Sequence, residues 1–425
     1  MEITQLYQLY LQHLSVTTDT RNISAGDIFF ALKGPSFNGN NFARQALDKG
    51  AAYVIAGEKI AIKDERIIET EDALLTLQQL AKYHREQFNI PFIAITGSNG
   101  KTTTKELVHT VLSSTYITYT TAGNLNNHIG IPLTLLRIKS DAQFAVIEMG
   151  ANNPKEIEGY CKYVQPAYGL ITNFGKAHLE GFGSIEGVRK AKSELFNYLK
   201  ENSGTAFVNA DDEFMIQLSA GIKKVVKYGT TNADTKGKVL DSTSFLKLTV
   251  SGNSVIDNMN THLVGEYNLT NVLAAVAIGN YFKVPDNKIK MTIENYAPAN
   301  SRSQMIVKDS NTIILDAYNA NPSSMKAAIE NFAKMEGTNK ILLLGGMMEL
   351  GNESKQEHFE IINIIKSFTW HKVVLVGPQF KEIKNSYLTF ENATEAKEWF
   401  KKQQFKNTSI LIKGSRSIQM EQILE

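Results

Sequence analysis

Residues 96–104, with the sequence TGSNGKTTT, combine residue types that bind phosphate. Gly97 and Gly100 permit backbone conformations and close approaches that a Cβ atom would hinder. The ammonium of Lys101 can neutralise the β- and γ-phosphates of a nucleotide, and Thr102 stands where phosphate loops place the hydroxyl that ligates Mg²⁺. We therefore predict a phosphate-binding loop of the short GxxGKT form, in preference to a plain strand–helix turn.

A carboxylate and an imidazole follow later apolar segments. Glu148 ends the apolar run at 144–148, and His178 lies in a loop after the run at 168–172. The carboxyl ends of strands in α/β sheets present side chains to ligands, and a carboxylate in that place suits Mg²⁺. The alternatives are an exposed strand-end glutamate and a structural histidine.

Lys190, Lys192 and Glu194 lie within a predicted helix at 184–199. By spacing alone they indicate an exposed, charged helix face and nothing more. Local pattern therefore assigns no chemistry to Lys192.

The elements that would position these residues alternate between strand and helix. Apolar strands are predicted at 92–96, 144–147 and 168–172, and helices at 101–113, 184–199 and 268–281. Such alternation is typical of a largely parallel sheet that helices cover on both faces. The fold class is therefore α/β.

Two further units flank this sheet. A strand at 27–32 and a helix at 41–49 indicate a small N-terminal α/β unit, and strands at 312–315, 341–344, 373–376 and 409–412 indicate a Rossmann-like C-terminal unit. The polar stretch 84–89 and the linker-like stretch 297–301 separate them from the centre. For a chain of 425 residues we therefore predict three domains, at 1–88, 89–298 and 299–425.

Composition narrows the class of protein. The 45 basic and 43 acidic residues nearly cancel, which argues against nucleic acid or anionic lipid as a partner. The lone Cys161 excludes an internal disulfide framework, fits a reducing compartment and is expected to be a packing residue. The N-terminus lacks the pattern of a signal peptide, and the apolar stretches are too short to span a bilayer. We expect a cytoplasmic protein with no membrane insertion.

In order and spacing, the motifs resemble those of the Mur ligase family along the whole chain. They are the loop at 96–103, Glu148, the pattern Asn173-x-Gly-x-x-His178 and the pair Ala191-Lys192. The resemblance implies an ATP-dependent acid–amino-acid (peptide) ligase that makes an amide through an acyl phosphate. It also implies two Mg²⁺ ions and a CO₂-derived carbamate on Lys192, which would hold the second ion together with His178.

The resemblance implies roles for individual residues. Those expected to be catalytic are Lys101, Glu148, His178 and Lys192, and those expected to hold metal are Thr102, Glu148, His178 and Lys192. Residues expected to bind ATP are Gly97, Ser98, Asn99, Gly100, Lys101, Thr102, Thr103, Asn268, Asn271, Arg302 and Asp316. The chain departs from the family pattern at Tyr267, where histidine is frequent, and at Gly346, where aspartate is frequent.

Four segments resemble one branch of the family, whose substrates are UDP-N-acetylmuramoyl-tripeptide and D-alanyl-D-alanine. They are 316–325 with its YNANP sequence, 123–132, 348–351 and 413–416. Residues 19–39 are similar to the part of the family that holds the UDP end of the substrate, although turn chemistry alone could account for them. Residues expected to bind substrate are Thr20, Arg21, Lys33, Asn38, Gly39, Asn124, Asn127, Tyr318, Asn319 and Asn321. The products would be ADP, phosphate and the UDP-muramoyl-pentapeptide precursor of peptidoglycan. We expect the enzyme to be a monomer.

Two alternative functions for the chain belong to different classes of protein. One is a ligase of the same superfamily with another substrate, such as an earlier muramoyl-peptide ligase or folylpolyglutamate synthase, against which the YNANP segment argues. The other is a phosphate-loop switch or motor, and the chain contains no guanine-reading Asn-Lys-x-Asp sequence to support it.

Overall fold

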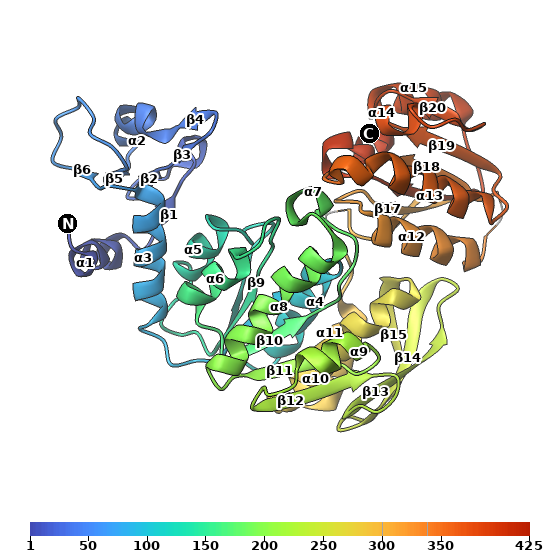
Figure 1. Ribbon diagram of the computed structural model, residues 1–425, viewed down its shortest axis with the longest axis horizontal. Helices are drawn as coiled ribbons and strands as arrows, with labels where there is room; N and C mark the ends of the chain where they lie inside the picture. The colour runs from blue at the N-terminus through green and yellow to red at the C-terminus, as the bar shows by residue number, and fades with distance from the viewer. Residues whose placement is uncertain (300, 338) are drawn as a thin grey trace.

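The computed structural model describes residues 1–299, 301–337 and 339–425. It forms three α/β domains, each built around its own sheet. The N-terminal and C-terminal domains rise from opposite ends of the central domain (Figure 1). We propose domain boundaries near 88–89 and 298–299; the predicted linker at 297–301 includes Asn300, which lies outside the described residues.

The N-terminal domain has a parallel sheet with the strand order β1-β2-β5-β6. Its strands are β1 (Val16–Thr17), β2 (Ile28–Ala31), β5 (Tyr53–Ala56) and β6 (Ile67–Glu69), with a separate hairpin of β3 (Lys33–Gly34) and β4 (Phe37–Asn38). Its helices are α1 (Ile3–His13), α2 (Ala43–Asp48) and α3 (Ala73–Arg85). All of β2 is buried, because α2 covers the face with Phe29 while α1 and α3 cover the face with Phe30. Helix α3 then leads down into the central domain (Figure 1).

The central domain has a mixed sheet with the strand order β15-β14-β13-β12-β11-β10-β7-β9-β8. These strands are β7 (Phe92–Thr96), β8 (Thr118–Thr120), β9 (Phe144–Glu148), β10 (Tyr168–Ile171), β11 (Thr205–Asn209), β12 (Lys224–Gly229), β13 (Thr235–Asp241), β14 (Phe245–Gly252) and β15 (Ile256–Val264). The helices are α4 (Lys101–Ser113), α5 (Gly130–Leu135), α6 (Glu156–Val164), α7 (Leu179–Phe182), α8 (Ile185–Glu201), α9 (Glu213–Leu218), α10 (Leu269–Tyr281) and α11 (Asp286–Asn295).

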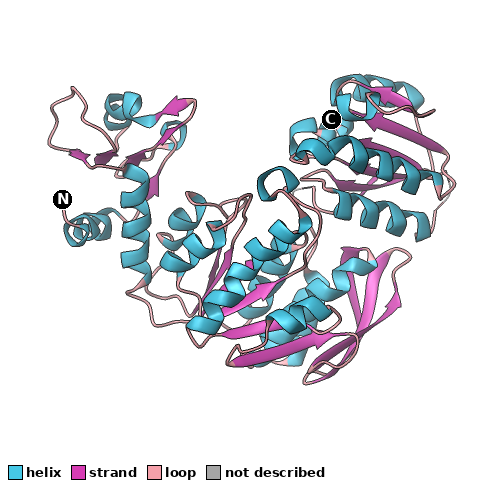
Figure 2. Cartoon of the chain, viewed as in Figure 1, coloured by secondary structure: helices cyan, strands magenta, loops and turns pink. Residues whose placement is uncertain are grey.

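Helices cover both faces of this sheet, as predicted (Figure 2). Ile93 and Ile95 of β7 pack with α4 and α10 on one face, whereas Phe92 and Ala94 join the core formed with α5, α6 and α8 on the other. The pairs β13–β14 and β14–β15 are antiparallel, and this ribbon is an addition to the expected parallel sheet. Cys161 is fully buried in this core, as expected of a packing residue.

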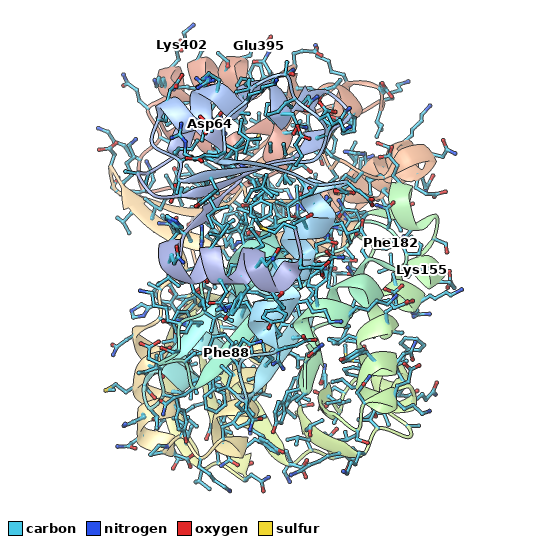
Figure 3. The ribbon with its side chains drawn as sticks, turned by 90° about the vertical axis from the view of Figure 1, so that its left-hand side faces the viewer. Asp64, Phe88, Lys155, Phe182, Glu395 and Lys402 are labelled. Atoms are coloured by element: carbon cyan, nitrogen blue, oxygen red, sulfur yellow. The ribbon has the colours of Figure 1, made fainter. Side chains whose placement is uncertain are left out.

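The C-terminal domain has the strand order β16-β17-β21-β18-β19-β20, parallel except for the β16–β17 pair. Its strands are β16 (Gln304–Lys308), β17 (Asn311–Asp316), β18 (Ile341–Gly345), β19 (Lys372–Val376), β20 (Leu388–Phe390) and β21 (Ser409–Lys413). Its helices are α12 (Pro322–Lys334), α13 (Ser354–Lys366), α14 (Pro378–Lys381) and α15 (Ala393–Gln403). Seen from the side of the N-terminal domain, with Asp64 in front, this domain lies behind at the top, where Glu395 and Lys402 are labelled (Figure 3).

The prediction that Lys192 belongs to an exposed, charged helix face was wrong. The helix at 184–199 exists as α8, but Lys192 is 1% exposed and does not belong to a solvated face. Ala191 and Ser193 beside it are also buried, because this part of α8 packs against the domain. Elsewhere, no helix in the described part of the chain combines the length and apolar character needed to cross a bilayer.

The burial of α10 gives a stability prediction. Leu273 is fully buried in the core that α10 shares with the sheet, so Leu273→Ala should lower the free energy of unfolding of the central domain by about 2–5 kcal/mol. Urea denaturation followed by circular dichroism measures this change. The control is Leu240→Ala, because Leu240 is 49% exposed and leaves no cavity. Equal destabilisation by both substitutions would contradict the packing described.

Candidate active site

The predicted phosphate loop joins β7 to α4 and lies against the end of β10. Gly97 has φ +140°, and a Cβ there would lie 2.0 Å from Thr172 Oγ1. The Thr172 hydroxyl donates to the carbonyl of Asn99 at 2.6 Å, and the amide N–H of Asn99 donates to Asn173 Oδ1 at 3.0 Å. Gly100 also has a left-handed conformation, with φ +77°, at the start of α4. The glycines are therefore required by close approach and by backbone angle.

Lys101 begins α4 and turns back over the loop. Its Nζ donates to the carbonyl oxygens of Gly97 at 2.8 Å and Ser98 at 3.1 Å. Burial lowers the pKa of Lys101, while the nearby charge of Glu148 acts in the opposite direction. The lysine is thus held within the loop, where it can meet a phosphate oxygen.

Glu148 is buried at the end of β9, with 1% exposure, so the interpretation as an exposed strand end was wrong. Its Oε1 accepts hydrogen bonds from Thr102 Oγ1 at 3.1 Å and from Asn126 Nδ2 at 2.7 Å. Its Oε2 is buried without a hydrogen-bond partner. Burying a carboxylate oxygen without compensation is costly, and Mg²⁺ prefers hard oxygen ligands. Glu148 and Thr102 therefore fit one Mg²⁺ ion.

His178 and Lys192 both lie near Phe182, which Figure 3 labels. The ring centroids of His178 and Phe182 are 6.4 Å apart, and Lys192 Nζ lies 5.2 Å from the centre of the Phe182 ring. His178 Nδ1 lies 2.6 Å from Glu349 Oε2, and this contact lowers the pKa of Glu349. Lys192 Nζ donates to the carbonyl of Ala151 at 3.1 Å, and burial lowers its pKa well below the ordinary value. Within the described residues, no three His, Cys, Asp or Glu side chains gather as a metal cluster.

The C-terminal domain contributes a second group of predicted residues. Asp316 Oδ1 accepts from the amide of Ser303 at 3.0 Å, and Asp316 Oδ2 accepts from Lys413 Nζ at 2.5 Å. Arg302 stacks on Tyr318, with its guanidinium carbon 3.5 Å from the ring centre. Asp316 is therefore held in place by its own domain, and Arg302 lies over an aromatic ring.

Asn321 connects the YNANP segment to the phosphate loop. Its side chain caps α12 by accepting from the amide of Ser324 at 2.9 Å. Its Nδ2 donates to Asn99 Oδ1 at 2.7 Å, across 222 residues of sequence. Ser323 Oγ accepts from the amide of Lys176 at 2.9 Å, so the start of α12 lies against two loops of the central domain.

Asn268 and Asn271 form a chain of hydrogen bonds beside the loop. Asn271 accepts from Thr104 Oγ1 at 3.0 Å and donates to Asn268 Oδ1 at 2.8 Å, and Asn268 donates to the carbonyl of Val264 at 2.8 Å. A Cβ at Gly100 would lie 2.7 Å from Asn271 Oδ1. These two amides support the phosphate loop, and both also line the cavity between the central and C-terminal domains.

One cavity of about 680 Å³ lies between the central and C-terminal domains. The predicted residues that line it are Ser98, Asn99, Gly100, Lys101, Thr102, Thr103, Asn124, Asn127, Glu148, His178, Asn268, Asn271, Arg302, Asp316, Tyr318, Asn319 and Asn321. Gly97 and Lys192 are not among its lining residues. The structure thus brings together most of the predicted nucleotide and metal residues.

The five residues predicted to hold the UDP end lie apart from this cavity, in the N-terminal domain. Arg21 pairs with Asp19 at 2.8 Å, whereas Lys33 Nζ and Asn38 Nδ2 both contact Glu58, at 3.0 and 2.8 Å. A Cβ at Gly39 would lie 2.6 Å from the carbonyl oxygen of Leu32. Thr20 begins a short 3-10 helix.

The two departures from the family pattern have local explanations. Tyr267 reaches Ser303 Oγ with its hydroxyl at 3.0 Å and so links the central domain to the start of the C-terminal domain. At Gly346, a Cβ would lie 2.4 Å from Gln379 Oε1. Gln379 therefore occupies the space that a side chain at position 346 would need.

Sequence reasoning missed several polar residues at the site, among them three that contact predicted site residues. Asn126 contacts Glu148, Glu349 contacts His178, and Lys413 contacts Asp316. All three lie in segments named above for their resemblance, but no local pattern indicates which side chains they meet. Glu349 comes from another domain than His178, so only the three-dimensional structure pairs them.

Known proteins are similar to this chain in all three domains. Three family models match, described as "Mur ligase family, catalytic domain" at residues 14–85, "Mur ligase middle domain" at 95–279 and "Mur ligase, glutamate ligase domain" at 301–416. The UDP-N-acetylmuramoyl-tripeptide–D-alanyl-D-alanine ligase of Bacillus subtilis is 35% identical over 424 residues, which cover 96% of this chain and 92% of that protein.

Solved structures are similar over nearly the whole chain. A crystal structure of MurF from Acinetobacter baumannii is 31% identical with a TM-score of 0.88, covering 98% of this chain and 97% of that one. The MurF ligase of Thermotoga maritima in complex with ADP is 26% identical with a TM-score of 0.86, covering 97% of both chains. The matched family models and the full-length relatives show that this chain belongs to the Mur ligase family.

Proposed function

We propose that this enzyme joins D-alanyl-D-alanine to UDP-N-acetylmuramoyl-tripeptide at the expense of ATP, giving a UDP-muramoyl-pentapeptide for peptidoglycan, ADP and phosphate. One observation carries the proposal: a single cavity is lined both by the phosphate loop and by the YNANP segment, which the Asn321–Asn99 hydrogen bond joins. The full-length similarity to ligases of that name supports the choice of substrates.

The chemistry has two steps. An oxygen of the tripeptide's terminal carboxylate attacks the γ-phosphorus of ATP, the bond to ADP breaks, and an acyl phosphate forms. The amine of D-alanyl-D-alanine then attacks the acyl carbon, the bond to phosphate breaks, and the amine loses a proton as the amide forms. Such steps depend on positioning and on stabilising charge, more than on covalent participation of the protein.

The residues of the chain act on these charges. The loop Gly97–Gly100–Lys101 would hold the phosphates of ATP through backbone N–H groups and the lysine ammonium, with Ser98, Asn99 and Thr103 beside them. Arg302 would approach the γ-phosphate, and Asp316 the ribose. Asn268 and Asn271 would hold the adenosine end while they support the loop.

Mg²⁺ would be held by Thr102 and Glu148 at one position, and by His178 and a modified Lys192 at a second. When bound, it would spread the negative charge of the phosphoryl group that is transferred. The unpartnered Oε2 of Glu148 supports the first position. The second position rests on the family resemblance together with the burial of Lys192.

Lys192 is suited to carbamate formation. Its amine is buried and makes one hydrogen bond, to the carbonyl of Ala151, and burial favours its uncharged form. An uncharged amine can attack CO₂, forming an N–C bond and releasing a proton. The resulting carbamate would turn a buried neutral amine into an anion that could hold a metal ion.

Substrate binding extends the site into both outer domains. Thr20, Arg21, Lys33, Asn38 and Gly39 would hold the UDP end. Asn124 and Asn127 would contact the muramoyl peptide, whereas Tyr318, Asn319 and Asn321 would contact D-alanyl-D-alanine. We propose that the enzyme acts as a monomer, in the cytoplasm where ATP and nucleotide-linked precursors are made.

Purified enzyme should release phosphate from ATP only when both UDP-N-acetylmuramoyl-tripeptide and D-alanyl-D-alanine are present. The reason is that formation of the acyl phosphate requires the tripeptide, and its conversion to the amide requires D-alanyl-D-alanine. The substrate requirement is measured by phosphate release, and the product is identified by mass spectrometry. Both measurements use tripeptides that end in lysine or diaminopimelate. Equal stimulation by glutamate or by a free diamino acid would assign another substrate, and turnover without either substrate would favour a phosphate-loop switch.

Lys192→Ala should lower kcat by about 10²-fold or more, because it removes a charge that stabilises phosphoryl transfer. Added bicarbonate should not restore activity, whereas a short carboxylate such as acetate should restore part of it. The matched control is Lys190→Ala, since Lys190 is exposed on the same helix and should leave the rate unchanged. An unmodified ammonium at Lys192 in a liganded crystal structure would count against the carbamate.

A further inference from the structure

Asn126 lies beside the buried carboxylate of Glu148. Its Nδ2 donates to Glu148 Oε1 at 2.7 Å, and the hydroxyl of Thr102 donates to the same oxygen at 3.1 Å. Asn126 also lines the cavity. None of the roles described above uses this side chain.

The main chain holds Asn126 firmly in this place. Its carbonyl accepts from the amide of Gly150 at 2.7 Å, so residue 126 bridges two residues at the end of β9. A Cβ at Gly150 would lie 3.0 Å from three atoms of the Asn126 side chain, so the amide packs directly over the strand end.

The loop that carries Asn126 is tied to the same strand end at its start. The amide of Glu148 donates to Thr121 Oγ1 at 3.0 Å, and the buried Lys105 of α4 donates to the carbonyl of Thr121 at 2.6 Å. The position of Asn126 relative to Glu148 is therefore set by contacts that its own side chain does not make.

The two donors make the two oxygens of Glu148 unequal. Both act on Oε1, while Oε2 is buried and has no partner. The terminal torsion of a glutamate is broad, so a single donor would allow the carboxylate to turn and exchange its oxygens. With two donors from different elements, the plane of the carboxylate is fixed.

We propose that Asn126 is a positioning residue that fixes Glu148 so that Oε2 faces a divalent cation in the cavity. This proposal depends on the proposed function in one respect only, which is that the ligase reaction requires a divalent cation. A neutral amide suits this role, because it donates a hydrogen bond without adding a charge that would compete with the cation. Ligands around metal sites are commonly oriented by such outer partners.

The first measurement is of cation binding without turnover. Mn²⁺ is titrated into enzyme with ADP, in the absence of muramoyl substrate, and free Mn²⁺ is followed by electron paramagnetic resonance. Asn126→Leu keeps a side chain of similar size without a donor, and Asn126→Ala removes it. Both should weaken Mn²⁺ binding by about 10- to 100-fold, whereas ADP binding in EDTA should change by less than about twofold.

The second measurement separates orientation from loop shape. The Mg²⁺ concentration for half-maximal activity should rise in both variants, and high Mg²⁺ should restore most of the rate, while the KM for D-alanyl-D-alanine stays unchanged. A matched control is Asn202→Ala, whose amide donates to the carbonyl of Tyr198 at 2.9 Å at an exposed helix end. This control should match the wild type in every assay.

Two results would overturn the inference. One is wild-type Mn²⁺ affinity in Asn126→Leu, which would mean that the side chain only fills space. The other is a fall in activity that Mg²⁺ does not restore and that accompanies a lower unfolding midpoint. Failure of the proposed function would look different, because wild-type enzyme would then make no pentapeptide while Asn126 still controlled Mn²⁺ binding.

Discussion

The pairing of β7 between β9 and β10 is the constraint on which the rest of the site depends. Both pairings are parallel, with Ile95 opposite Glu148 on one side and Thr96 opposite Ile171 on the other. Parallel strands in adjacent positions end at the same edge of the sheet. This register alone therefore brings together the phosphate loop, the carboxylate of Glu148 and the loop that leads to His178.

Charge balance follows from this placement. Burial lowers the pKa of Lys101 and of Lys192; the opposite charge of Glu148 raises the pKa of Lys101, whereas the like charge of Lys101 lowers that of Lys192 further. Asp316 and Lys413 bring an ion pair from the C-terminal domain. A buried charge is tolerated when partners or ligands compensate it. The cavity is thus arranged for ligands that carry both negative phosphates and positive metal ions, and the Asn99–Asn321 contact keeps the C-terminal domain beside it.

Local patterns in the sequence were enough to predict the phosphate loop and the elements around it. The helix after Gly100 begins and ends where its pattern indicated, because strand, glycine loop and helix are encoded by neighbouring residues. Lys192 was not predictable in the same way: three charged residues in five resemble a solvated face, and only packing of α8 reveals the burial. The antiparallel ribbon was missed although β13 alternates buried and exposed residues at its start, as a half-buried strand does. Contacts such as His178 with Glu349 join residues of different domains, which periodicity cannot pair.

The central claim is that ATP phosphorylates the terminal carboxylate of the muramoyl tripeptide before the amide forms. The most direct test is a single turnover with tripeptide that carries ¹⁸O in both oxygens of that carboxylate, followed by mass spectrometry of the released phosphate. The account predicts one ¹⁸O atom in the phosphate and the other in the new amide, because the bond between acyl carbon and bridging oxygen breaks in the second step. Phosphate free of ¹⁸O, with amide still formed, would contradict it.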